Sequence, residues 1–197
     1  MKFVTLGPAG SNHDFVTRRY LDFHGIAERA DVALAVDFEE GVRAVLQGNA
    51  DYLVQCAVHP ATPRTVARWF DGLYAIDTFI SPSQDLAVLQ RHDAKNATRL
   101  AAMRPTLEYV DVSRWESVEL VDTVAEVTRG LVTGAYGVGL GYAAVAEARP
   151  ELLRITQFVG TVDDAWIVYG RSRLCNGQLA GWRDGPAGRL YRGGAPA

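Results

Sequence analysis

The sequence predicts an α/β protein built from two similar lobes. Apolar runs of strand length alternate with segments of helical period along most of the chain, a pattern typical of strand–helix–strand units. One such unit occurs twice: a strand ends in Val-Asp, a helix follows, and a glycine turn leads into the next strand. The two copies, at 36–52 and 121–136, are offset by 85 residues at the start and by 86 at the glycine. We therefore expect two lobes of one design, the alternative being a chance likeness between generic units.

Four strands and three helices are predicted in the first half of the chain. The helices follow from apolar residues at helical spacing, such as Phe15, Tyr20 and Phe23, and from the glycines that end the first two. Pro63 favours the first turn of the third helix. The predicted strands are 3–6, 32–36, 52–58 and 75–80, and the predicted helices are 15–23, 38–46 and 62–70.

The second half continues the alternation, and so predicts mostly parallel sheets. The predicted strands are 86–89, 118–121, 136–140, 152–159 and 165–169, and the predicted helices are 123–132 and 142–148. The polar segment 90–106 is predicted to be a connecting helix or loop. We expect lobe I to comprise 1–78 plus 155–171, and lobe II to comprise 79–154.

Composition excludes several classes of protein. The 197 residues carry a net charge of −3, which argues against a general nucleic-acid binder. No uncharged apolar run of about 20 residues predicts a membrane span, and residues 1–7 do not resemble a secretory signal. Two cysteines cannot form a disulfide framework. A cytoplasmic protein without membrane contact is the simplest interpretation. No metal-ligand spacing or nucleotide fingerprint is present, so we expect neither a metal nor a cofactor.

The charge is unevenly distributed. From Arg171 onward five arginines face one acid, Asp184, so this segment is +4 and residues 1–170 carry −7. Residues 172–197 are rich in Gly, Pro and Arg, a composition that favours a flexible tail. The alternative is an arm that docks on the acidic body of a partner subunit.

The loop 7–13 (Gly-Pro-Ala-Gly-Ser-Asn-His) joins the first strand to the first helix. Gly10 allows close backbone approach and Ser11 can cap the helix. The free N–H groups of the first turn, assisted by the helix dipole, form a candidate site for a carboxylate or phosphate. Gly10, Ser11, Asn12 and His13 are therefore candidate binding residues, the alternative being an ordinary capped turn.

Polar groups also end the third strand. Gln55 and His59 follow apolar residues there, and side chains at the carboxyl end of a parallel strand face the ligand crevice. His59 could donate a hydrogen bond to a carboxylate or move a proton near neutral pH, or it could be a structural hydrogen-bonding residue. Cys56 has no base or cation beside it in the sequence and is expected to pack in the core.

Further candidates lie where the chain crosses between lobes and on the repeated unit. Ser81 and Ser83 belong to a hydroxyl-rich crossing, and Thr123 is expected to cap the helix of the second copy. Asp163 and Asp164 lie in a late turn, where they would be poor neighbours for an anionic ligand.

The order of these segments resembles the catalytic domain of prephenate dehydratases over residues 1–171. That family opens with a strand followed by Gly-Pro-x-Gly-Thr-Phe-Ser, and residues 7–13 stand in that place. The Asp122-Thr123 helix start is similar to its Ser-Thr-Ala, and 164–171 fill its final strand. The resemblance implies a two-lobed type 2 periplasmic-binding-protein-like fold, each lobe a mostly parallel sheet flanked by helices, with the ligand cleft between the lobes. It also implies a homo-oligomer.

Two departures from the family shape the functional expectation. Asp164 and Ala165 replace its Thr-Arg pair, and 58–60 (Val-His-Pro) replace its Glu-Asn-Ser. Loss of the arginine removes a bidentate carboxylate clamp that alanine cannot replace. The runs 11–20 and 55–60 look more like the prephenate decarboxylase branch of bacilysin-type pathways, which removes carbon dioxide without aromatising the ring.

The resemblance therefore implies a lyase of aromatic amino acid or antibiotic biosynthesis that decarboxylates prephenate or a similar cyclohexadienyl acid. His59 is the candidate proton donor. The loop residues, with Gln55, Ser81, Ser83 and Thr123, are candidate substrate contacts. The alternatives are a non-catalytic small-carboxylate-binding protein, a prephenate dehydratase proper, and a different lyase or hydrolase.

Overall fold

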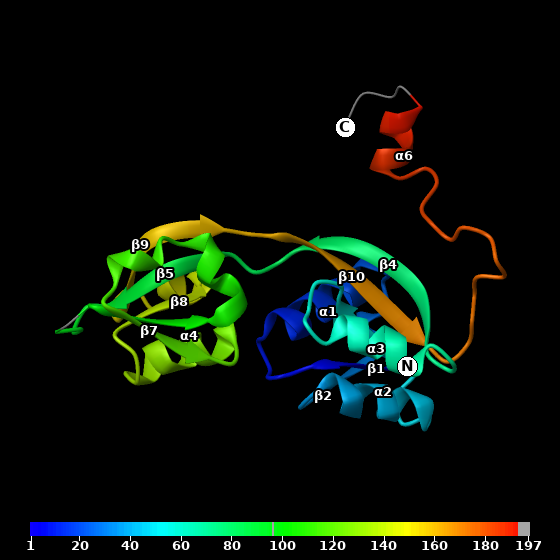
Figure 1. Cartoon of the computed structure of the whole chain (residues 1–197), viewed down its shortest axis with the longest axis horizontal. Helices are drawn as coiled ribbons and strands as arrows, with labels where there is room; N and C mark the ends of the chain where they lie inside the picture. Colours follow the sequence, from blue (N-terminus) through cyan, green and yellow to red (C-terminus); the bar gives the residue numbers. More distant parts are fainter. Residues whose placement is uncertain (96, 193–197) are drawn as a thin grey trace.

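The computed structural model describes residues 1–95 and 97–192 and shows two lobes side by side (Figure 1). Each lobe is built on one five-stranded sheet, with strand order β2-β1-β3-β10-β4 in the first and β7-β6-β8-β5-β9 in the second. The chain passes from the first sheet to the second between β4 and β5, and returns between β9 and β10.

Lobe I contains most of the helices. Its elements are β1 (Lys2–Leu6), α1 (Asn12–Phe23), η1 (Ala27–Arg29), β2 (Asp31–Ala35), α2 (Phe38–Leu46), β3 (Tyr52–Cys56), α3 (Thr62–Trp69), β4 (Tyr74–Pro82) and β10 (Asp163–Gly170).

Lobe II has two 3-10 helices where lobe I has α1. Its elements are β5 (Leu86–Arg91), β6 (Arg99–Met103), η2 (Arg104–Tyr109), η3 (Val112–Arg114), β7 (Ser117–Val121), α4 (Val124–Thr133), β8 (Val138–Tyr142), α5 (Ala143–Ala148) and β9 (Leu153–Gly160). The predicted tail, 172–197, is described as far as Arg192 and contains α6 (Pro186–Tyr191), while Asn96 and 193–197 lie outside the described residues.

The two sheets share one pattern of strand directions. β1 pairs in parallel with β2 and β3, and β6 does so with β7 and β8. β10 and β5 are each antiparallel to both neighbours. Four strands of each sheet therefore run one way and one runs against them, which confirms the predicted two-lobed α/β fold with mostly parallel sheets.

Helix capping shows that the two copies of the repeated unit are offset by 86 residues from cap to glycine. Asp37 caps α2 and Thr123 caps α4, each through a side-chain oxygen that accepts from a backbone N–H three residues later. The caps are 86 residues apart, as are the turn glycines Gly48 and Gly134, both with positive φ. The strands before these helices, β2 and β7, also end 86 residues apart, at Ala35 and Val121, so neither copy has an extra residue. The offset of 85 came from matching the two Val-Asp pairs, whereas the structural counterpart of Asp37 is Thr123.

Two expectations about the chain path need correction. The segment 90–106 was expected to contain no strand, but it contains β6, which lies between β7 and β8. Its buried residues include two alanines, Ala101 and Ala102, and alanine gives little strand signal. The lobe boundaries also differ: 79–82 belong to β4 of the first sheet, and 155–160 belong to β9 of the second.

Successive side chains of β3 point to opposite faces of the first sheet, and this shows which face lies beneath α1. Leu53 packs in the cluster that covers α2, whereas Val54 and Cys56 pack in the cluster beneath α1. Trp166 of β10, which pairs with Cys56, is fully buried in the same cluster as Cys56. The first turn of α1 therefore lies over the carboxyl end of β3.

Candidate functional site

The loop before α1 is held by its own hydrogen bonds. The Ser11 hydroxyl donates to the Leu6 carbonyl (3.2 Å) and accepts from the Asp14 N–H (3.3 Å), and this residue is only 6% exposed. Gly10, at φ 76°, donates its N–H to Asp14 Oδ2 (2.9 Å). Asp14 in turn pairs with Arg18. The predicted cap is confirmed, and the Ser11 hydroxyl is already engaged within the loop.

Asn12, Ser83, Gln84 and Asp164 form what we call the crossing network. Asn12 Nδ2 donates to Ser83 Oγ (2.7 Å), and Ser83 Oγ donates to Asp164 Oδ2 (2.6 Å). The Gln84 N–H donates to Asn12 Oδ1 (3.0 Å). Two of the predicted substrate contacts, Asn12 and Ser83, therefore bind each other and fasten α1 to both segments that join the lobes.

Four aromatic side chains meet beside this network and form what we call the ring cluster: His13, Phe38, His59 and Trp166. The ring centroids of His13 and His59 are 5.6 Å apart. Phe38 lies 5.3 Å from His13 and 4.8 Å from His59, and Trp166 lies 5.0 Å from His13. All four contacts are edge-to-face, so both imidazoles lie in apolar surroundings.

Backbone donors define the tautomer of each histidine. His13 Nε2 accepts from the Cys56 N–H (3.4 Å), which leaves the proton on Nδ1. His59 Nδ1 accepts from the Ala61 N–H (3.1 Å), which leaves the proton on Nε2. The His59 Nε2–H is therefore the group that can meet a ligand.

Burial keeps both rings neutral. It lowers the pKa of His13 to about 3, with a smaller contribution from neighbouring His59. Burial also lowers the pKa of His59 from its ordinary value of 6.5. At neutral pH the ring of His59 in the free protein is therefore a hydrogen-bond donor through Nε2, and it is not an imidazolium.

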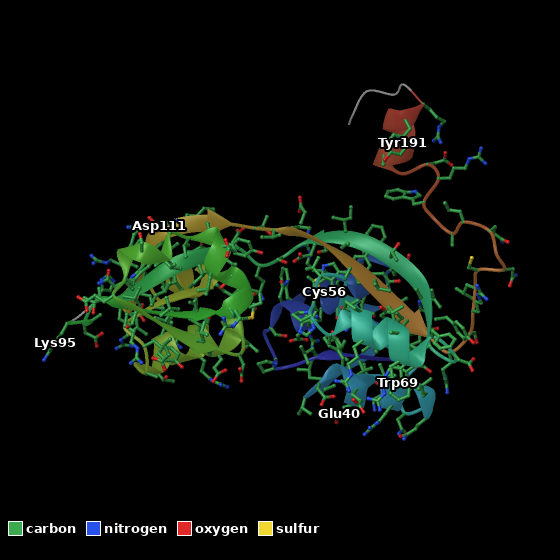
Figure 2. All side chains as sticks on the ribbon, in the orientation of Figure 1. Glu40, Cys56, Trp69, Lys95, Asp111 and Tyr191 are labelled. Atoms are coloured by element: carbon green, nitrogen blue, oxygen red, sulfur yellow. The ribbon has the colours of Figure 1, made fainter. Side chains whose placement is uncertain are left out.

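Cys56 lies within lobe I (Figure 2), and burial raises the pKa of its thiol to about 11, with a further contribution from Asp164. The thiol is therefore protonated and buried at neutral pH, as expected for a packing residue.

Lobe II supplies two tyrosines to this region. Burial raises the pKa of Tyr109, at the end of η2, and the charges of Asp164 and Cys56 raise it further. Burial raises the pKa of Tyr142 to about 12, partly offset by a hydrogen bond from the backbone of Asn12. Two phenol groups of the second lobe therefore lie close enough to be affected by lobe I: Tyr109 by Asp164 and Cys56, and Tyr142 by the first turn of α1.

The other predicted contacts lie elsewhere or are engaged. Gln55 is 0% exposed and donates to Thr65 Oγ1 of α3 (3.2 Å), so it lies behind the sheet and cannot meet a ligand in this conformation. Its position in a strand alternates away from the site. Ser81 is also buried, and Thr123 caps α4 as predicted by accepting from the Glu126 N–H (3.0 Å).

Sequence reasoning missed Phe38, Trp166, Tyr109 and Tyr142 and gave Asp164 no role. The only available signal was that Asp164 belongs to the altered Thr-Arg motif and that Trp166 directly follows it. Among residues 1–95 and 97–192, no three His, Cys, Asp or Glu side chains are placed to hold a metal ion. No helix in the described part of the chain is both long and apolar enough to cross a bilayer.

Comparison with known proteins identifies the fold. No family model matches the chain, and no curated protein matches it. Among solved structures it is similar to the prephenate dehydratase of Arthrobacter aurescens in complex with L-Phe, at 16% identity and a TM-score of 0.67, over 91% of this chain and 62% of that one. It is also similar to the prephenate dehydratase of Staphylococcus aureus, at 12% identity and a TM-score of 0.60, over 88% of this chain and 67% of that one.

A third similar structure is the periplasmic VFT2 domain of Bordetella pertussis BvgS, at 13% identity and a TM-score of 0.52, over 86% of this chain and 80% of that domain. The chain spans about 62% of the length of the Arthrobacter protein. These likenesses define the class: a two-lobed, periplasmic-binding-protein-like fold of the kind found in prephenate dehydratases.

Proposed function

We propose that the protein binds prephenate, or a similar cyclohexadienyl carboxylic acid, between its lobes and decarboxylates it without aromatising the ring. One observation carries this proposal: His59 lies in an apolar ring cluster as a neutral imidazole whose proton is on Nε2. Similarity to the fold of prephenate dehydratases supports the choice of substrate class.

The side chains of the site are poorly suited to dehydration. Loss of a hydroxyl group needs an acid beside it, and the Cys56 thiol, whose pKa is raised by burial, is poorly suited to that role. Asp164 accepts a hydrogen bond from Ser83 Oγ. Ala165, in the place of the family's arginine, offers no guanidinium to bind a carboxylate.

The same surroundings favour decarboxylation. The bond between the ring carbon and its carboxylate breaks, carbon dioxide leaves, and the electron pair spreads over the neighbouring double bonds. The negative charge of the carboxylate is compact, whereas the charge of the carbanion that forms is dispersed over several ring carbons. Apolar aromatic surroundings destabilise the dispersed charge less than the compact one. A proton must then be added to a ring carbon other than the one that bears the hydroxyl.

His59 can supply that proton after its ring has taken up a second proton from solvent, and substrate binding favours this uptake. A bound dicarboxylate would place negative charge beside the ring and raise the pKa of His59, because an opposite charge favours the protonated form. Protonation at Nδ1 would cost the hydrogen bond from the Ala61 N–H. The imidazolium would therefore form chiefly when an anionic ligand is present.

The direct test is incubation with prephenate at neutral pH. We expect prephenate to disappear with release of carbon dioxide and without phenylpyruvate. Formation of phenylpyruvate would identify a dehydratase instead. Unchanged prephenate, together with a thermal shift caused by prephenate or other small carboxylates, would identify a non-catalytic binding protein.

A matched pair of histidine variants tests the role of His59. His59→Ala is expected to lower turnover by about 10²–10⁴-fold, the usual contribution of a proton-transferring group, while a prephenate-induced thermal shift remains. His24→Ala is the control, because His24 lies near Asp77 at the other end of α1. Equal losses in both variants would remove His59 from the mechanism.

A further inference from the structure

An apolar groove opens on lobe I at the point where β10 ends and the C-terminal segment begins. The cavity measures about 440 Å³ and is lined by α3, the start of β4, β10 and the first residues after β10. Its lining is mainly apolar, and Phe70 at its edge is 73% exposed. Tyr169 also lines it, and its buried hydroxyl has no hydrogen-bond partner among the described residues.

Beyond Cys175, which lines the groove, the C-terminal segment carries apolar side chains of the kind that could fill it and leaves its own lobe. Residues 176–192, here called the arm, run away from both lobes to α6, which ends at Tyr191 (Figures 1 and 2). Leu179 is 93% exposed and Trp182 is 74% exposed. Exposed apolar residues that gather on one segment mark an interaction site.

We propose that the arm docks into this groove on a second copy of the chain, so that two copies exchange arms around a twofold axis. The groove lies at the base of the arm, so one copy can give its arm and receive the partner's at the same place, as a closed twofold contact requires. Trp182 is the anchor that would fill the groove beside Phe70.

Charge on the two surfaces is complementary. Asp71 follows Phe70 at the groove edge, and Arg183 follows Trp182 in the arm. Neither residue forms an ion pair within the part of the chain that the structure describes. The net charge is +4 from Arg171 onward and −7 over residues 1–170. The C-terminal segment of one copy is therefore attracted to the body of another copy as well as to its own. This inference does not depend on the proposed reaction.

Sedimentation velocity on the full chain tests the proposal. We expect a reversible dimer that both Trp182→Ala and Phe70→Glu weaken, by on the order of 30-fold in Kd for a central aromatic anchor. Phe23→Ser is the matched control, because Phe23 is an exposed aromatic of α1 that lies outside groove and arm. It should leave the dimer unchanged.

Mixing the two variants separates exchange between copies from docking within one copy. The Phe70→Glu chain keeps a native arm and the Trp182→Ala chain keeps a native groove, so a mixed dimer retains one native contact. The mixture should therefore associate more tightly than either variant alone. The proposal would be overturned if the unmodified chain sedimented as a monomer at every concentration. That result would include the case in which the arm docks into the groove of its own chain. A dimer that neither variant weakens would overturn it too.

Discussion

The two lobes share one topology but solve the packing of helix on strand in opposite ways. In lobe I, Leu53 of β3 packs against Gly41 of α2, where an added Cβ would lie 3.0 Å from Leu53 Cδ1. In lobe II, the positions 86 residues later are reversed: Gly139 of β8 faces Val127 of α4. Each lobe thus pairs one large and one small residue, but on opposite partners.

A second difference follows the first strand of each sheet. β1 leads into α1, whose first turn carries His13, whereas β6 leads into the 3-10 helix η2, which ends at Tyr109. The comparison teaches that strand order and helix caps are common to both lobes while side-chain size and chemistry have diverged. Lobe I holds His13 and His59, whereas lobe II contributes Tyr109 near Asp164 and Tyr142 near Asn12.

The largest expected effect comes from the buried indole of lobe I. Trp166 is 0% exposed and packs against His13, so Trp166→Ala should lower the free energy of unfolding by about 3–5 kcal/mol. Trp115→Ala in lobe II is the comparison, because Trp115 is only partly buried, and should cost clearly less. Urea unfolding at neutral pH measures both, and equal losses would contradict the packing described for the ring cluster.

The next effect concerns the acid sensitivity that His13 gives to lobe I. Its pKa is about 3 in the folded chain against an ordinary 6.5, so between these values the unfolded chain binds a proton that the folded chain does not. The contribution of neutral His13 to the free energy of unfolding is therefore fully present above pH 6.5. It falls by roughly 1 kcal/mol for each pH unit below that value. Urea unfolding from pH 7 to pH 4 should show a shallower pH dependence in His13→Gln, and parallel curves would be the contrary result.

The reversed packing predicts unequal responses to the same substitution. Gly139→Ala would place Cβ 2.6 Å from Val127 Cγ1 and 3.1 Å from the Ala101 carbonyl oxygen, a clash expected to cost about 1–3 kcal/mol. Gly41→Ala is crowded only by the end of the flexible Leu53 side chain, with Val4 at ordinary contact distance. The substitution also gains helix propensity, so its net effect should stay within about 1 kcal/mol.

Thermal unfolding of the two glycine variants measures this difference. In the Gly139→Ala background, Val127→Ala should cost less than it does alone, because it removes the clashing methyl group. Additive losses would show that the two positions do not oppose each other.

The fold was largely predictable because its signals are local. The alternation of strands and helices and the caps Ser11 and Thr123 all appear in the sequence and in the structure. β6 was missed because Leu-Ala-Ala is buried by neighbouring strands and has little strand propensity of its own.

The candidate site was predictable only in part, because its assembly is not local. Sequence position indicated His13 and His59, but only the folded chain shows that Phe38 and Trp166 surround them. The orientation of Gln55 depends on which face of β3 it occupies, and a strand buried on both faces gives no periodic signal to decide that. Likewise, Asp164 gains its partner Ser83 from a segment 81 residues earlier.

The smallest effects are expected at the two equivalent caps, and salt should distinguish them. Asp37→Ala and Thr123→Ala each remove an oxygen that accepts from a backbone N–H of the first turn, at a cost of about 1 kcal/mol. Asp37 also places a negative charge at the positive end of the helix dipole, an interaction that salt screens. The loss in Asp37→Ala should therefore shrink when urea unfolding is repeated at high salt, whereas the loss in Thr123→Ala, a neutral cap, should not. Identical salt dependence in both variants would mean that the charge of Asp37 contributes nothing and that the lobes are capped by hydrogen bonding alone.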